Sequence, residues 1–107
     1  YAKLTGANFN QANLANANMT EAKIDRAILR QAILSKTDLS KADIRGSDLE
    51  HADLRNANLR EADLRGSDLQ NANLIGADLS GAKLDGANLS DVKSDESTIF
   101  PEGYSLN

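Results

Sequence analysis

Residues 52–61 read ADLRNANLRE, the same five-residue pattern written twice. A small residue is followed by a polar residue, a large apolar residue and two further positions. Steps of five from Leu54, back to Leu4 and on to Leu89, meet a large apolar residue at all 18 positions. Two residues before each of them lies alanine in 15 units, and in the others Thr37, Ser47 and Ser67. The unit small–polar–large–x–x therefore governs residues 2–91.

A period of five fits neither regular element. An α-helix would spread the large residues over all its sides. A strand alternates with period two, so a step of five would turn successive large residues to opposite faces. The chain must therefore change direction once in each unit and keep the large residue, called here the centre, inside. Six of the seven glycines lie two residues after a centre, at the position called here the corner. Because glycine accepts the positive φ of the third residue of a type II turn, the sequence predicts a turn at each corner.

The units resemble the pentapeptide-repeat family, whose motif reads A-(D/N)-L-x-x and which residues 52–61 match in both copies. The resemblance covers residues 2–91. It implies an all-β fold, a right-handed quadrilateral parallel β-helix with four units in each square coil. The 18 units then make about 4.5 coils, and residues 20 apart become vertical neighbours. Four faces follow, named here by their first centres: first face Leu4, second Phe9, third Leu14 and fourth Met19.

The β-helix is predicted to span residues 1–93, because the next centre position holds Ser94. Residues 94–107 are predicted to form a short C-terminal cap or tail. Its apolar side chains would cover the last layer of the core: Ile99, Phe100, Tyr104 and Leu106. A partner-binding tail is the other interpretation. The repeat is already in phase at Ala2, so the first coil shows no cap. This leaves open an end-to-end contact with another chain, or further repeats upstream.

The composition favours a binding module over an enzyme. The chain carries 12 basic and 16 acidic residues, a net charge of -4, which does not indicate a nucleic-acid binder. It has no cysteine, a single histidine and no glycine-rich phosphate loop. A packed aliphatic interior leaves no cleft for a small-molecule substrate. We therefore expect no enzymatic activity, cofactor, metal ion or membrane span. The compartment stays unknown: cytoplasm, or lumen or periplasm if an upstream targeting segment was removed.

One candidate surface breaks the pattern of the position before each centre, called here the slot. The slot holds Asn or Asp in 13 of 18 units and Lys in three, but Ile28 and Ile33 in the other two. These isoleucines lie in consecutive units on adjacent faces around one corner. Together with Arg26 and Arg30 they form the preferred surface for a protein partner.

The second candidate surface is acidic. On the second face Asp48 and Asp68 stack, with Glu50 beside them, and the nearest arginine is Arg30, one coil above. A solvated face is the alternative interpretation. These carboxylates could hold Ca²⁺ only loosely, because they are not expected to converge as in a binding loop.

Two functions follow as hypotheses. The leading one is a non-catalytic structural or interaction module, whose rigid surface is recognised by an unidentified protein. The alternative comes from the resemblance: some family members mimic DNA and inhibit or protect DNA gyrase. A mimic needs a long acidic surface. Here four arginines interrupt the acidic residues: Arg45, Arg55, Arg60 and Arg65.

Overall fold

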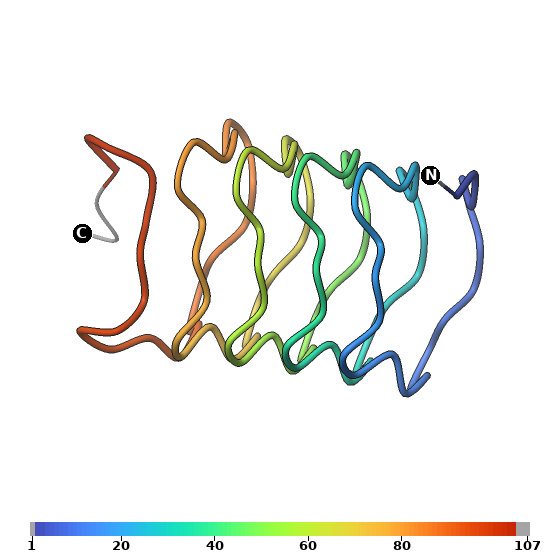
Figure 1. Ribbon diagram of the computed structural model, residues 1–107, viewed down its shortest axis with the longest axis horizontal. Coiled ribbons are helices and arrows are strands. Elements are labelled where there is room, and N and C mark those ends of the chain that lie inside the picture. The colour runs from blue at the N-terminus through green and yellow to red at the C-terminus, as the bar shows by residue number, and fades with distance from the viewer. Residues whose placement is uncertain (1, 105–107) are drawn as a thin grey trace.

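The computed structural model describes residues 2–104, and in it the chain winds as one continuous coil (Figure 1). Each slot residue pairs in parallel with the residue 20 positions later, from Lys3 with Lys23 to Asn73 with Lys93. Four units therefore complete one turn, and the predicted right-handed quadrilateral β-helix is confirmed. The described residues contain no helix and no strand longer than a single paired residue. Each unit contributes one such residue before the chain turns. No helix in this part of the chain could cross a membrane.

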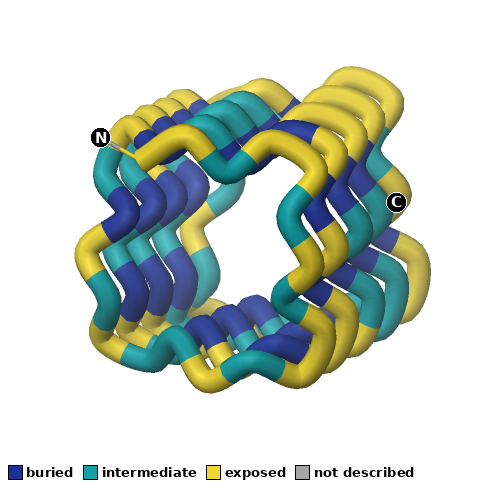
Figure 2. Tube along the Cα trace, turned by 90° about the vertical axis from the view of Figure 1, so that its right-hand side faces the viewer, coloured by how far each residue is buried: buried dark blue, intermediate teal, exposed yellow. Residues whose placement is uncertain are grey.

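The centres form the core. The structure measures 32 × 21 × 20 Å, and its cross-section is square (Figure 2). The centres from Ile24 to Leu79 are all less than 2% exposed, whereas Leu4, Phe9 and Leu14 of the first coil are only partly buried. Stacking supplies this burial, since each coil covers the next one.

Every corner adopts the predicted turn. All 18 corner residues from Gly6 to Asp91 have positive φ, between 56° and 77°. Each turn is closed by a backbone hydrogen bond, as where the Ala7 N–H donates to the Leu4 carbonyl at 2.9 Å. Nine corners hold neither Gly nor Asn, and such residues pay about 1–2 kcal/mol in this conformation. The stacked coil thus imposes the turn even where the residue does not favour it.

Substitutions at two glycine corners can distinguish the cost of backbone strain from the cost of a steric clash. Gly66 and Gly76 both have positive φ, but a Cβ at Gly66 would meet no atom within 4 Å, while one at Gly76 would collide with the Asn56 side chain. We expect Gly66→Ala to cost about 1 kcal/mol of unfolding free energy through strain alone. Gly76→Ala should cost about 2 kcal/mol, because the Asn56 amide must also move. Urea unfolding of both variants measures the difference. Equal losses would contradict the stacking of corner 56 over corner 76.

A hydrogen bond to the backbone explains why most slots hold Asn or Asp. Each Asn or Asp at a slot accepts, through Oδ1, the backbone N–H two residues later. Asn8 accepts from Asn10 at 2.9 Å, and Asp78 accepts from Ser80 at 2.9 Å. All 13 such side chains between residues 8 and 88 make this bond. The bond satisfies a backbone donor just after the centre, and such bonds typically contribute about 1 kcal/mol.

The coil path continues beyond Lys93. Asp78 pairs with Ile99 rather than with residue 98, so one extra residue is accommodated before this unit. Thr98 takes the small position, and its hydroxyl donates to the Leu74 carbonyl at 2.8 Å. Thr37 makes the equivalent bond to the Leu14 carbonyl. A unit whose centre is Phe100 therefore extends the ladder of the fourth face.

This unit and the residues that follow it only partly match the predicted lid. Phe100 and Tyr104 pack against the core, and their rings stack with centroids 5.5 Å apart. Ile99 was predicted to join them, and this is wrong: it fills an outward slot and is 49% exposed. Leu106 lies outside the described residues.

Candidate functional site

The two slot isoleucines lie on the surface, as the pattern predicts. Ile28 is 40% exposed and Ile33 is 39% exposed. Asn8 lies above Ile28 and Asp48 below it, while Asn13 and Asp53 flank Ile33 in the same way. An isoleucine side chain cannot accept the hydrogen bond that these Asn and Asp neighbours accept. Both isoleucines therefore give up a bond of the scaffold and place apolar surface in water.

Arg30 joins the two candidate surfaces. In three units an aspartate in the slot holds the arginine two residues later, with Nη2–Oδ2 distances of 2.6–2.7 Å. In the unit of Arg30 the slot holds Ile28 instead. The guanidinium therefore reaches the next coil, 3.3 Å from Glu50 Oε1 and 3.7 Å from Asp48 Oδ2. The surface around Ile28 and Ile33, called here the apolar corner, and the acidic face of Asp48, Glu50 and Asp68 are thus one continuous surface.

The acidic face is tighter than the sequence suggests. One carboxylate oxygen from each of Asp48, Glu50 and Asp68 lies within 4.8 Å of the others. Asp48 and Asp68 already accept the backbone N–H groups of Glu50 and Gln70, at 3.1 and 3.0 Å. Arg30 also lies beside Asp48 and Glu50. The carboxylates are therefore already bound by backbone N–H groups and by a guanidinium.

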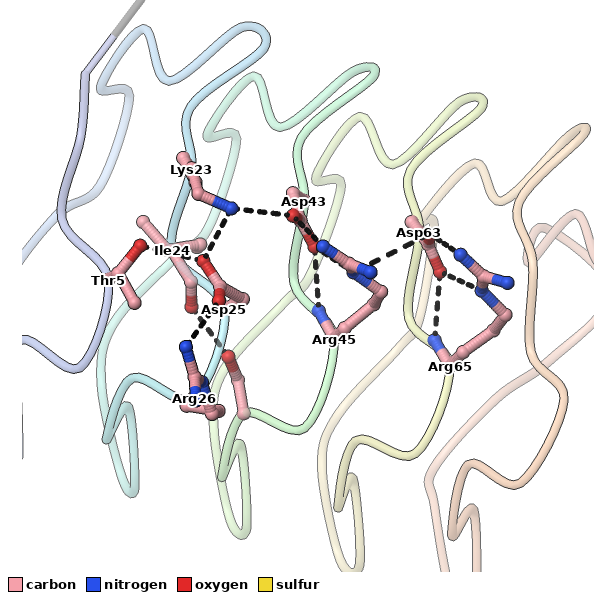
Figure 3. Close-up of polar contacts among 10 residues, drawn as sticks. Thr5, Lys23, Ile24, Asp25, Arg26, Asp43, Arg45, Asp63 and Arg65 are labelled. Carbon is pink, nitrogen blue, oxygen red and sulfur yellow. Dashed lines mark hydrogen bonds and ion pairs between the residues drawn. The ribbon is translucent and has the colours of Figure 1, made fainter.

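The first face carries an alternating ladder of charge (Figure 3). Lys23 Nζ lies 3.3 Å from Asp43, which Arg45 holds at 2.7 Å, and Asp63 and Arg65 repeat this pair one coil below. The hydrogen bond from Arg45 holds the pKa of Asp43 well below its usual range, and Arg65 lowers the pKa of Asp63 in the same way. The ladder neutralises itself and leaves little charge for a partner.

Asp25 is a buried carboxylate that the sequence does not reveal. It follows a centre, where side chains normally point outward, yet it is only 5% exposed. The Thr5 hydroxyl donates to it at 2.8 Å and lowers its pKa, and Lys23 lies 3.3 Å away. A shallow hollow of about 330 Å³ opens beside it, also lined by Arg26, Arg45 and Gly46. Asp85, in the equivalent position three coils later, is exposed, so residue type alone carries no signal.

The pairs between a slot aspartate and the arginine of the same unit predict that the protein loses stability in acid. The arginines beside Asp43, Asp53 and Asp63 lower the pKa of each carboxyl below its ordinary value of 3.8. Groups with a depressed pKa stabilise the fold fully above that ordinary value, and the contribution is lost as the pH falls towards the folded-state pKa. For three partly exposed pairs we expect a loss of about 1–2 kcal/mol between pH 5 and pH 2, measurable by urea unfolding.

Asparagine at the same three slots is the matched control, because it can keep the hydrogen bond to the backbone and loses only the charge. The triple variant should show a distinctly flatter pH dependence. An unchanged slope would mean that the pairs do not stabilise the fold.

Comparison with known proteins agrees with this geometry. The family model described as pentapeptide repeats matches residues 1–31, 29–60 and 52–91. A pentapeptide repeat protein from the cyanobacterium Cyanothece 51142 is 40% identical and superposes with a TM-score of 0.86, covering 87% of this chain and 63% of its own. One from the Arabidopsis thaliana thylakoid lumen is 30% identical, with a TM-score of 0.83 and coverage of 85% and 63%.

A third structure, a pentapeptide repeat protein from Nostoc PCC 7120, is 40% identical, with a TM-score of 0.72 and coverage of 92% and 78%. This chain spans 63% of the length of the first two relatives. No curated protein sequence matches it. The unit pattern, the coil and these matches agree, and the chain belongs to the pentapeptide-repeat family.

Proposed function

We propose that this chain is a non-catalytic interaction module that binds a protein partner through the corner formed by Ile28 and Ile33. One observation carries the proposal: all 13 slots with Asn or Asp serve the backbone, whereas these two adjacent slots hold exposed isoleucines. Three slots hold lysine, and Ile99 is a single exposed slot isoleucine, so what distinguishes Ile28 and Ile33 is that two apolar exceptions lie side by side. Departures from a local rule are expected chiefly where function requires them. Two neighbouring apolar side chains on a rigid corner offer a partner a small fixed contact.

The rest of the surface supports a scaffold rather than a reaction site. The aspartates of the slots hold the turns, and three of them are also paired with arginines of their own units. The proposed module therefore needs only its shape and its exposed corner.

No observation favours the second candidate, a DNA mimic that binds gyrase. A mimic must present uncompensated negative charge along its length. On the first face the half-buried carboxylates of Asp43 and Asp63 each have an arginine nitrogen within 2.7 Å. A gyrase supercoiling assay, with and without a fluoroquinolone, should show no effect of the protein. Inhibition or drug protection would reverse this ranking.

The experiment for the proposed function compares three baits in an extract of the native cell. These are the unchanged chain, the double variant Ile28→Asn/Ile33→Asn, and Ile75→Asn as the matched control. Ile75 lies on the third face but outside the slot, and it is half-buried. We expect the same protein to be retained by the unchanged chain and by Ile75→Asn, and lost by the double variant. If the double variant keeps every interaction, the corner is not the binding surface.

A further inference from the structure

The second coil carries a band of positive charge on an otherwise acidic rod. Within residues 22–41 there are five basic and two acidic residues, a net charge of +3. Because the whole chain has a net charge of -4, the remaining residues sum to -7. The five basic residues are Lys23, Arg26, Arg30, Lys36 and Lys41. The band and the two slot isoleucines thus fall in the same coil, although they are independent features of the sequence.

Three of the five cations bracket the apolar corner. Arg26 lies two residues before Ile28, Arg30 lies between the isoleucines, and Lys36 follows Ile33. The side chain of Arg26 is 75% exposed, although its Nη2 lies 3.4 Å from Asp25 Oδ2. The side chain of Arg30 is 50% exposed, and Lys36 is exposed as well. Glu50 and Asp48 hold Arg30 from the coil below, so its guanidinium is oriented while the side chain stays half exposed.

Two of these cations occupy backbone positions that do not favour them. Arg26 and Lys36 are corner residues with φ of 56° and 58°, where glycine would be less strained. Glycine does occupy six other corners, among them Gly46 directly below Arg26. Seven other corners also hold residues other than Gly and Asn, so the backbone does not single out Arg26 and Lys36. What these two residues add is positive charge on either side of Ile28 and Ile33.

We infer that the partner presents an acidic surface to this corner, with apolar side chains flanked by carboxylates. The inference rests on the proposed function and names the chemistry of its partner. Charge complementarity would guide the encounter and exclude basic surfaces, and burial of the isoleucines would supply the affinity. The partner's carboxylates should lie level with the second coil, where these cations are, because the coil immediately below carries Asp48 and Asp53 in the slots under Ile28 and Ile33.

Three synthetic peptides test this chemistry by NMR titration of the isotope-labelled chain. The first carries two leucines between four glutamates, and in the others glutamine or lysine replaces every glutamate. We expect the acidic peptide to shift backbone amide signals of residues 26–36, with an affinity about tenfold above that of the glutamine peptide. The lysine peptide should bind more weakly than either.

The double variant Arg26→Gln/Lys36→Gln is the second arm, and its own spectrum reports whether it is folded. It should remove the preference for the acidic peptide and leave weak binding through the isoleucines. Equal binding of all three peptides, or shifts mapped outside the second coil, would overturn the inference. The capture experiment above decides separately whether the corner binds a protein at all, because it compares isoleucine variants and does not depend on charge.

Discussion

Replacing Leu54 with alanine is expected to lower the free energy of unfolding by about 3–4 kcal/mol. Leu54 is fully buried between two other centres of the third face, Leu34 above and Leu74 below. The rigid coils on both sides keep their spacing, because each is held by backbone hydrogen bonds to its neighbours, as where the Leu54 N–H donates to Asn73. The cavity can therefore collapse only slightly, and the lost contacts are not recovered.

Leu14→Ala is the matched control, because Leu14 is the first centre of the same ladder and is only partly buried. It should cost about half as much as Leu54→Ala or less. Urea unfolding followed by circular dichroism measures both. Equal losses would show that the ladder does not gain its stability from being covered on both sides.

Replacing Ala57 with leucine is expected to cost about 3 kcal/mol or more. Ala57 is 1% exposed, at the small position two residues before the Leu59 centre. The other small positions hold alanine, serine or threonine, which indicates that this layer has room only for short side chains. A leucine would have to displace neighbouring centres from their rotamers or push two coils apart, and the second change breaks ladder hydrogen bonds.

Ala7→Leu provides the comparison, since Ala7 is the equivalent residue of the second face in the first coil and is only half-buried. With no described coil above it, the larger side chain can turn outward, so the expected loss is about 1 kcal/mol or less. The difference in urea midpoint between the two variants is the test. A similar small loss for both would mean that the interior has room for larger side chains at Ala57.

Much of this architecture could be predicted from the period alone. The position of every centre, small residue and corner follows from a step of five, and the structure confirms the positive φ that the glycines indicate. The number of units in a coil could not be derived in this way and came from the family resemblance. The period of five shows that the chain turns once in each unit. It does not give the angle of each turn, which decides how many units complete a coil.

The end of the coil was harder to predict, because its signal is lost where the centre becomes Ser94. Without a large residue to mark the register, the extra residue before Thr98 cannot be located from the sequence, and Ile99 resembles a lid residue. The hydroxyl bond of Thr98 restores the register and shows Ile99 to be a slot residue. Predictions from periodicity therefore fail first where one unit changes length.

The candidate surfaces were identified as exceptions to the pattern, and their physical meaning needed the structure. The sequence shows that Ile28 and Ile33 depart from the Asn or Asp of other slots, but not that those residues hold the next backbone N–H. It places Arg30 above Glu50, but not their contact at 3.3 Å, which joins the two surfaces. Side-chain reach of this kind depends on rotamers, which no repeat pattern specifies.

The most direct test is the urea unfolding free energy of Ile28→Asn/Ile33→Asn relative to the unchanged chain. If the isoleucines serve binding, the new asparagines recover the slot hydrogen bonds, and these offset the lost burial of side chains that are already about 40% exposed. The predicted stability then lies within about 1 kcal/mol of the unchanged chain. A loss of about 3 kcal/mol or more would make Ile28 and Ile33 part of the structural core and would contradict their role as a partner surface.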